Sequence, residues 1–339
     1  MYNNILFKKN PNLKYKLDIT YDSTNDGWND TFEIFKSKKD NKDYLISPNS
    51  YKYNLDIFTL FDNKLIKSLQ GHESKIRTVR YFSNRDEEYL TSADEDYILI
   101  VWDVTNDYKI KHKIDVNGNI YSSLIIFHNN NQYIVTSTNS TSHDKYKAAT
   151  KLYSLYDGEF IRLIKDTNYY YVQYLLPWLN KKDNNYYIIQ FAKNAILINN
   201  LLDDEVYSEF IQEPEDYHYG GYIINKESEE YLVSSSFNGF INIWDLFNKK
   251  IFKIINTDKC YLSSVIQWSN KYIIVADYDK KSFKIIDLEQ NKVICNIKWQ
   301  YSDRIRSIKK VLHPIYGESL LSSSNDGVIS LWTLEGNLY

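Results

Sequence analysis

Three segments of this chain align with one another without gaps, and this repetition constrains the fold more than any other feature of the sequence. They are Leu90–Asp103, Leu232–Asp245 and Leu320–Thr333. Each contains a short apolar strand, a turn rich in Ser, Asp, Asn or Gly, and a second alternating strand that leads into Trp. Because one such unit cannot bury its apolar face by itself, a chain that repeats it must stack several copies. The pattern predicts an all-β repeat fold.

The spacing of the tryptophans predicts how many copies there are. The gaps from Trp102 to Trp244 and from Trp244 to Trp332 correspond to three and two periods of about 44–47 residues. Weaker copies of the pattern fill these gaps and precede Trp102, so the sequence predicts seven repeats. The residues expected at the Trp place are Phe58, Trp102, Tyr153, Ile198, Trp244, Ile286 and Trp332.

The Gly71-His72 pair, the turn from Ser92 to Asp96, and the Trp-Asp dipeptides that begin at Trp102 and Trp244 resemble WD40 repeats. The resemblance implies a single domain over residues 1–339, a seven-bladed β-propeller of four-stranded antiparallel blades. A kelch-type propeller is the alternative, but it predicts other glycine and aromatic signatures and a period of about 50 residues. The expected blades cover residues 28–70, 71–115, 116–166, 167–213, 214–258, 259–299 and 300–333.

The last blade needs a strand from elsewhere in the chain. Too few residues follow Trp332 to form a turn and an outer strand. The segment Leu13–Ile19 alternates between apolar and polar residues, so we expect it to supply that strand and to close the ring. Such a closure would hide strand edges that otherwise invite aggregation.

The composition shows how the turns are built. The chain has only 10 glycines and 5 prolines, against 32 tyrosines. Asn and Asp also tolerate left-handed turn positions, so we expect them to replace glycine there. Tyrosine stands at the Trp place in Tyr153 and at a His place in Tyr301, which predicts blades held together largely by aromatic packing.

A polar set recurs in the best-preserved repeats. The resemblance implies that in the second repeat Trp102 donates to Ser92, which bonds His72, which bonds Asp96. Buried indole and imidazole groups need partners, because an unsatisfied group costs about 1–3 kcal/mol. No nucleophile motif accompanies the set, so we interpret it as structural rather than catalytic. Its expected members elsewhere are Ser234, Asn238 and Trp244 in the fifth repeat, and Ser322, Asp326 and Trp332 in the seventh.

Other features argue against catalysis, nucleic-acid binding and membrane insertion. The histidines show no metal-ligand spacing, and Cys260 and Cys295 are interpreted as inert core thiols in a reducing compartment. The net charge is −3 and the isoelectric point is near 6.1, so no global positive field attracts nucleic acid. Met1–Tyr15 lacks the apolar region of a signal peptide, and no stretch is long enough to span a bilayer. We expect a soluble, intracellular and cytoplasmic protein that is not an enzyme and binds no cofactor or metal.

The expected binding site is also implied by the resemblance. Related propellers bind partners across the face where the inner strands begin, around the central channel. Arg77 and Arg306 occupy equivalent places near that rim, and the ring would bring them into one sector. An arginine there suits acidic or phosphorylated peptides, although exposed arginines often serve only solubility. The other residues expected on this face are Glu95, Phe237, Asn325, Tyr121 and Tyr219, with Ser263 in the sixth repeat.

Three functions fit these expectations. The first is a protein-interaction scaffold or adaptor. The second is a substrate receptor of a cullin-type ubiquitin ligase, weakened because the places where such receptors carry Arg or Lys hold Thr105, Phe247 and Glu335. The third is an RNA- or ribosome-associated propeller, against which the acidic isoelectric point argues. Tyr169–Tyr171 either lines the binding face or fills a weak blade.

Overall fold

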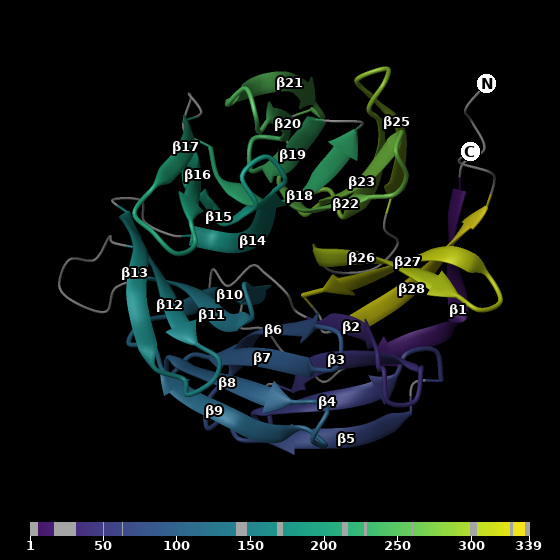
Figure 1. The fold of residues 1–339 in the computed structure, drawn as a ribbon. Helices are drawn as coiled ribbons and strands as arrows, with labels where there is room; N and C mark the ends of the chain where they lie inside the picture. Colours follow the sequence, from purple (N-terminus) through teal and green to yellow (C-terminus); the bar gives the residue numbers. More distant parts are fainter. Residues whose placement is uncertain are drawn as a thin grey trace. The chain divides into compact units, whose positions relative to one another are not determined.

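Strands are the regular elements of the chain wherever its structure is described. The structure is a computed structural model, and it describes residues 6–16, 32–49, 51–62, 64–139, 148–167, 172–211, 216–226, 229–258, 260–298, 304–325 and 328–335. These ranges contain 28 strands, which form seven four-stranded antiparallel sheets (Figure 1). The chain divides into two compact units, residues 26–215 and residues 1–25 with 216–339.

The unit of residues 26–215 contains four sheets, each built from consecutive strands. The first sheet consists of β2 (Glu33–Lys36), β3 (Asp43–Asn49), β4 (Asn54–Thr59) and β5 (Leu65–Gln70). The second consists of β6 (Ile76–Ser83), β7 (Glu88–Asp94), β8 (Ile98–Asp103) and β9 (Lys109–Asp115). The third consists of β10 (Ile120–His128), β11 (Asn131–Asn139), β12 (Ala148–Ser154) and β13 (Phe160–Thr167). The fourth consists of β14 (Val172–Asn180), β15 (Asn185–Ala192), β16 (Ala195–Asn200) and β17 (Val206–Ile211).

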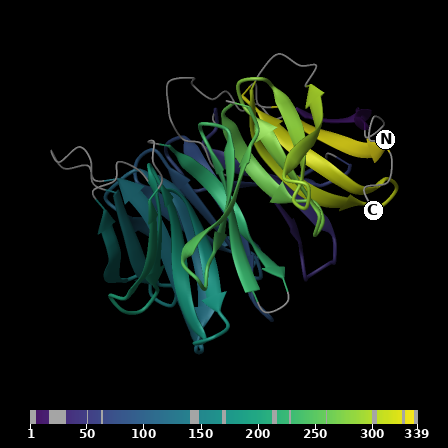
Figure 2. The ribbon, with the colours of Figure 1, turned by 90° about the horizontal axis from the view of Figure 1, so that it is seen from above.

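The other unit contains three sheets, drawn from green to yellow in Figures 1 and 2 apart from the N-terminal strand β1, which is purple. The fifth sheet consists of β18 (His218–Lys226), β19 (Glu229–Ser236), β20 (Phe240–Asp245) and β21 (Lys250–Asn256). The sixth consists of β22 (Leu262–Gln267), β23 (Tyr272–Asp277), β24 (Ser282–Asp287) and β25 (Lys292–Lys298). The seventh consists of β26 (Ile305–His313), β27 (Gly317–Ser324), β28 (Val328–Glu335) and the N-terminal strand β1 (Leu6–Lys16). The fold is an all-β propeller with seven four-stranded blades.

The strand β1 is the outer strand of the seventh sheet. It pairs antiparallel with β28 from Leu6 opposite Glu335 to Lys16 opposite Val328, with a register shift between Lys9 and Lys14. The expected strand Leu13–Ile19 therefore overlaps β1 only over residues 13–16, and residues 17–19 lie outside the described ranges. Closure of a ring by this strand stays a prediction.

The seven residues expected at the Trp place occupy equivalent positions. Each lies in the third strand of its sheet and pairs with an apolar residue of the second strand. Trp102 pairs with Leu90, for example, and Ile198 pairs with Ile189. The seven-repeat prediction is confirmed at these positions.

Burial explains why second and third strands are the most apolar. Every residue of β7 and β16 is buried, whereas the outer strand β21 is mostly exposed. The apolar side chains of neighbouring sheets pack together, as where Ile46 and Ile57 of the first sheet meet Leu90, Ile100 and Trp102 of the second. The hydrophobic core therefore consists of layers between adjacent sheets, within each unit.

The turns use few glycines, as the composition predicts. Positive φ angles occur at several asparagines, including Asn41, Asn129, Asn184 and Asn291. Gly239, between β19 and β20, is different because its φ is +83° and an added Cβ would lie 2.8 Å from the backbone nitrogen of Cys260. Only glycine fits this turn without a backbone shift.

Candidate partner-binding face

The second sheet contains the buried polar chain, with one change of residue. Trp102 Nε1 donates to Ser92 Oγ at 2.8 Å, Ser92 Oγ lies 2.7 Å from His72 Nε2, and His72 Nδ1 lies 2.6 Å from Asp94 Oδ2. The predicted carboxylate, Asp96, is exposed in the turn, and its backbone N–H donates to Asp94 Oδ1. Asp94 takes the place because it ends β7 and, two residues after Ser92, lies on the same side of the strand.

The fifth and seventh sheets keep the pairing of Trp with Ser. Trp244 donates to Ser234 and Trp332 to Ser322, both at 2.9 Å. Asn238 lies in the turn after β19, where its backbone N–H donates to Asp216 Oδ1, and its place in the Trp244 chain stays a prediction. Asp216 is buried and caps this turn, and its burial raises the pKa of its carboxyl. Asp326 and Tyr301 lie outside the described residues.

The sixth sheet replaces the polar chain with an ion pair that the sequence reasoning missed. Lys284 Nζ lies 3.3 Å from Asp277 Oδ2, and both side chains are buried. Asp277 pairs with the first residue of its inner strand, as Asp94 does in the second sheet. The available signal was a lone lysine within the apolar strand that ends at Asp287.

Six inner strands share a β-bulge directly after their first residue. In each, the pairing with the second strand skips one residue, which is left unpaired. A bulge bends the strand and re-aims this side chain, and bulges are common next to functional sites. We call the strand ends that carry these residues the bulge face. The bulge residues are Arg77, Tyr121, Gln173, Tyr219, Ser263 and Arg306.

In the unit of residues 26–215, the bulge face carries a charged pair. Arg77 Nε lies 3.5 Å from Glu95 Oε1, and the two side chains are 15% and 28% exposed. Tyr121 and Gln173 are buried. The accessible groups here are therefore the opposed charges of Arg77 and Glu95. Gln173 was not among the residues expected on this face.

In the other unit, the bulge face carries a cluster of aromatic rings. The Tyr261 ring centroid lies 4.7 Å from that of Tyr219, 5.0 Å from that of Phe237 and 4.7 Å from that of Tyr278. Phe237 is 45% exposed, while the three tyrosines are buried. Burial also raises the pKa of the Tyr261 hydroxyl. The cluster presents one accessible ring on a rigid aromatic base, and its centre, Tyr261, was missed by the sequence reasoning.

Two arginines lie beside this cluster, and they differ in their exposure to solvent. Arg306 is buried, and its Nε donates to Asn325 Oδ1. Asn325 in turn donates to the hydroxyl of Tyr278 at 3.4 Å. Arg304 is exposed, with its guanidinium carbon 5.0 Å from the centre of the Tyr278 ring. At this end of the seventh sheet, the accessible guanidinium group is therefore that of Arg304 and not that of Arg306. The expected convergence of Arg77 with Arg306 stays a prediction.

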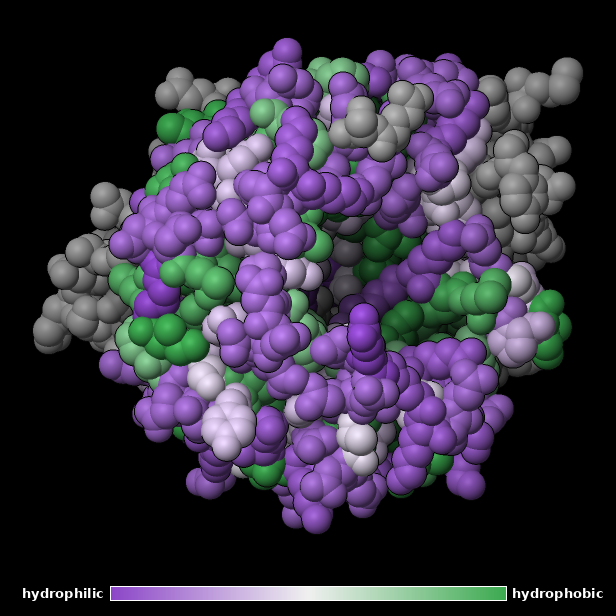
Figure 3. Space-filling view, in the orientation of Figure 1, coloured by the Kyte–Doolittle hydropathy of each residue, from purple (hydrophilic) through white to green (hydrophobic). Residues whose placement is uncertain are grey.

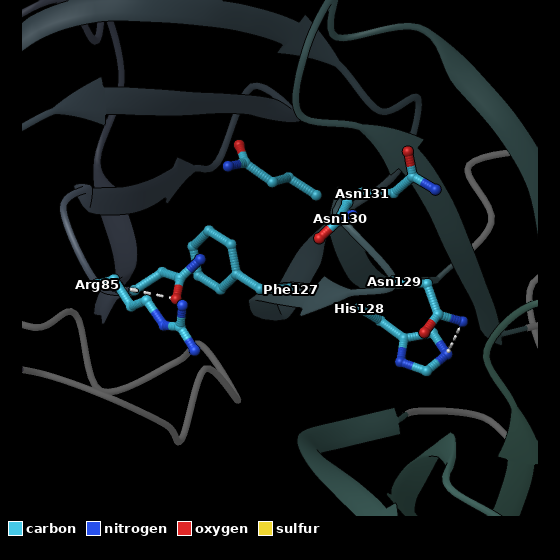
Figure 4. Close-up of a pocket in the computed structure, with 8 residues that line it drawn as sticks. Arg85, Phe127, His128, Asn129, Asn130 and Asn131 are labelled. Atoms are coloured by element: carbon cyan, nitrogen blue, oxygen red, sulfur yellow. Dashed lines mark hydrogen bonds between the residues drawn. The ribbon is translucent and has the colours of Figure 1, made fainter.

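A polar pocket of about 440 Å³ lies at the C-terminal ends of β6 and β10, away from their bulges (Figure 4). Its lining includes Arg85, Phe127 and His128, together with several amide side chains. Asn129 Nδ2 donates to His128 Nε2 at 2.9 Å. His128 and Asn129 thus bond with each other, and nothing in the arrangement of the lining residues points to a reaction.

Two further properties limit the kinds of site that the molecule carries. Among the described residues, no group of three or more His, Cys, Asp or Glu side chains is arranged to hold a metal ion. The same part of the chain contains no helix long and apolar enough to cross a membrane. Figure 3 shows that hydrophilic side chains dominate the visible face, with apolar side chains in smaller groups.

Similarities to known proteins agree with this fold. Residues 63–103 match the WD40 family, described as WD domain, G-beta repeat. A segment of 76 residues, 22% of this chain, is 37% identical to WD repeat protein iqw1 of Schizosaccharomyces pombe and spans 9% of that protein. The crystal structure of Raptor from Chaetomium thermophilum matches 92% of this chain with a TM-score of 0.68 at 13% identity, and the match covers 29% of the Raptor chain.

Both matches span less than a third of the relative's own length, and the Raptor match shows the fold alone. The family match coincides with the sheet that holds the chain from Trp102 to Asp94. The molecule is a WD-repeat β-propeller. It belongs to the WD40-repeat family.

Proposed function

We propose that this protein is a non-catalytic scaffold that binds a protein or peptide partner across the bulge face. The observation that carries the proposal is the half-exposed ring of Phe237, seated on the aromatic base formed around Tyr261. Aromatic side chains held in well-packed surroundings are typical binding hot spots. Cys260 and Cys295 are both free thiols, which suits a protein that meets its partners in a reducing compartment.

The charges on the face support an acidic or phosphorylated partner segment. Arg304 is accessible beside the aromatic cluster, and Arg77 is partly accessible beside Glu95. A guanidinium can bind a carboxylate or a phosphate through two parallel hydrogen bonds. A partner segment that combines an apolar side chain with a negative charge would therefore contact both Phe237 and Arg304.

Affinity capture followed by mass spectrometry tests this proposal. We expect Phe237→Ala and Arg77→Glu each to deplete the captured partners by about tenfold, as loss of a hot spot does. The matched controls are Leu312→Ala, which removes another exposed apolar side chain, and Arg85→Glu, which reverses an arginine in the pocket at the far end of β6. If Phe237→Ala and Arg77→Glu both recovered as much partner as the wild-type protein, the bulge face would be rejected as the site.

An exchange of charges separates binding from folding. The double variant Arg77→Glu with Glu95→Arg keeps an ion pair at this place but reverses its polarity. We expect wild-type thermal stability and reduced capture of acidic partners. Full capture by the folded double variant would show that the orientation of the pair does not matter.

The alternative functions receive little support from the described residues. Thr105, at one of the places where a cullin-type receptor would carry Arg or Lys, accepts a hydrogen bond from the backbone N–H of Glu88 at 3.0 Å. Its hydroxyl therefore stabilises the second sheet. For RNA, salt-dependent retention would be the distinguishing measurement.

A further inference from the structure

A cysteine and a lysine are in direct contact beneath the bulge face of the unit that contains residues 216–339. Cys260 lies in the connection between β21 and β22, and Lys284 lies in β24. Lys284 Nζ is 2.9 Å from Cys260 Sγ. The residues are 5% and 2% exposed, respectively. This contact is part of neither the polar chains nor the proposed binding surface.

The surrounding groups hold the nitrogen and the sulfur in this arrangement. Lys284 Nζ donates to the carbonyl oxygen of Thr257 and is paired with Asp277. Thr257 Oγ1 lies 3.2 Å from Cys260 Sγ. Gly239 packs so closely against the backbone of Cys260 that even a Cβ there would clash. Both side chains are buried among these groups.

We propose that hydrogen peroxide joins Cys260 to Lys284 through a single oxygen atom, forming an S–O–N cross-link. One bridging oxygen holds sulfur and nitrogen at nearly the separation they already have. A direct S–N bond would instead require a much larger approach of two buried side chains. The geometry thus favours insertion of oxygen between these two atoms.

The reaction consumes two molecules of peroxide. The sulfur of Cys260 attacks the first, so that an S–O bond forms, the O–O bond breaks and water leaves, giving a sulfenic acid. The ammonium group of Lys284 passes a proton to the carboxylate of Asp277, and the second peroxide then oxidises the resulting amine to a hydroxylamine, again with loss of water. Condensation of the two groups forms the S–O–N bridge and releases a third water. Reversal to thiol and amine takes four electrons, which two molecules of dithiothreitol supply.

The environment makes this a slow reaction. Burial raises the pKa of the Cys260 thiol, which disfavours the reactive thiolate, while the hydrogen bonds with Lys284 and Thr257 act in the opposite direction. We therefore expect the cross-link to accumulate over hours of exposure rather than within seconds. Once formed, it would tie the β21–β22 connection to β24 and raise the temperature of unfolding.

Peptide mass spectrometry of the full chain tests the cross-link. The folded protein is treated with hydrogen peroxide, and its free thiols are then blocked. We expect the peptides that contain Cys260 and Lys284 to be found as one linked species. This species has gained one oxygen and lost two hydrogens, resists trypsin at Lys284, and separates again after dithiothreitol. The variant Cys295→Ser should retain it, and Cys260→Ser should abolish it.

Three outcomes would overturn the proposal. In the first, Cys260 is recovered as a thiol, or as sulfinic or sulfonic acid, with Lys284 unmodified. In the second, the linked product lacks the added oxygen. In the third, equal cross-linking occurs in chain unfolded by urea, which would show that the folded contact plays no part. Circular dichroism of the Cys260→Ser variant establishes that its lack of product comes from a folded protein.

Discussion

At the scale of single residues, the structure separates positions that the sequence treats as alike. Asp94 and Asp96 both lie near the turn after β7, but only Asp94 contacts His72. Strand geometry decides between them, because Asp94 remains in β7 and shares a side with Ser92. The aligned motif could not resolve this difference of two residues.

The two carboxylates should therefore differ in their effect on stability. We expect Asp94→Ala to lower the free energy of unfolding by about 1–3 kcal/mol, since it leaves buried His72 without its acceptor. Asp96→Ala should change it by less than about 0.5 kcal/mol, as is usual at exposed sites. Urea denaturation of both variants checks this, and equal losses would contradict it.

His218 is a buried histidine that should make stability depend on pH. It is fully buried, its ring nitrogens have no hydrogen-bond partner, and burial lowers its pKa from 6.5 to about 4. Below pH 6.5 the unfolded chain gains a proton at this residue that the folded chain does not bind until about pH 4. Stability is therefore lost as the pH falls through this interval, by at most about 3 kcal/mol.

Replacement of His218 by isoleucine should remove this loss. Ile76 and Ile305 occupy the same register position in the second and seventh sheets, so isoleucine suits the site. The pKa of neighbouring Asp216 is raised, so this residue changes stability with pH in the opposite direction. Because it does so in the wild type and in the variant alike, the comparison of the two proteins isolates the contribution of His218. Unfolding free energies at pH 7 and pH 4.5 test the prediction. An unchanged difference between the two pH values would refute it.

At the scale of strands and sheets, equivalent positions in different sheets are stabilised by chemically different polar groups. Asp94 of the second sheet is paired with His72, whereas Asp277, at the equivalent place in the sixth sheet, is paired with Lys284. Both place a basic side chain beside a buried carboxylate, because a charge in the interior needs a partner. The bulges, by contrast, recur in six sheets although the bulged residues range from serine to arginine. Backbone pairing is thus conserved within the molecule where side chains are not.

The ion pair of the sixth sheet gives a prediction for that sheet. Lys284→Met should destabilise the protein by about 3–5 kcal/mol, because it leaves the buried carboxylate of Asp277 without a countercharge. The double variant with Asp277→Leu should recover most of this loss, since well-packed apolar pairs often match buried ion pairs. Thermal unfolding measures both. A double variant as unstable as Lys284→Met would argue against a charge effect.

At the scale of the whole molecule, the N-terminal strand completes a sheet whose other strands come from the C-terminal part of the chain. Without β1, the edge of β28 would be open to pairing with other chains. We expect deletion of residues 1–16 to increase amide hydrogen exchange in β28 and β27, to promote aggregation, and to leave β7 and β8 protected. Wild-type protection of β28 in the truncated protein would show that β1 adds no stability.

The sequence by itself determined the strand pattern and the number of repeats. Alternating apolar residues and the recurring Trp place are local properties, so Trp102, Tyr153 and Ile198 could be aligned before any contact was known. It also pointed to Arg77 and Phe237, because both places could be found by aligning the repeats with one another.

Tertiary structure alone decided which groups meet. Tyr261 joins rings from neighbouring sheets, Arg306 is buried against Asn325, and Lys284 in β24 reaches Cys260 in the β21–β22 connection. Such contacts depend on the packing of residues far apart in the chain and on bulges that arise only when strands pair. A repeat pattern specifies each strand's apolar side, but the chemistry at the strand ends follows from how the sheets pack together.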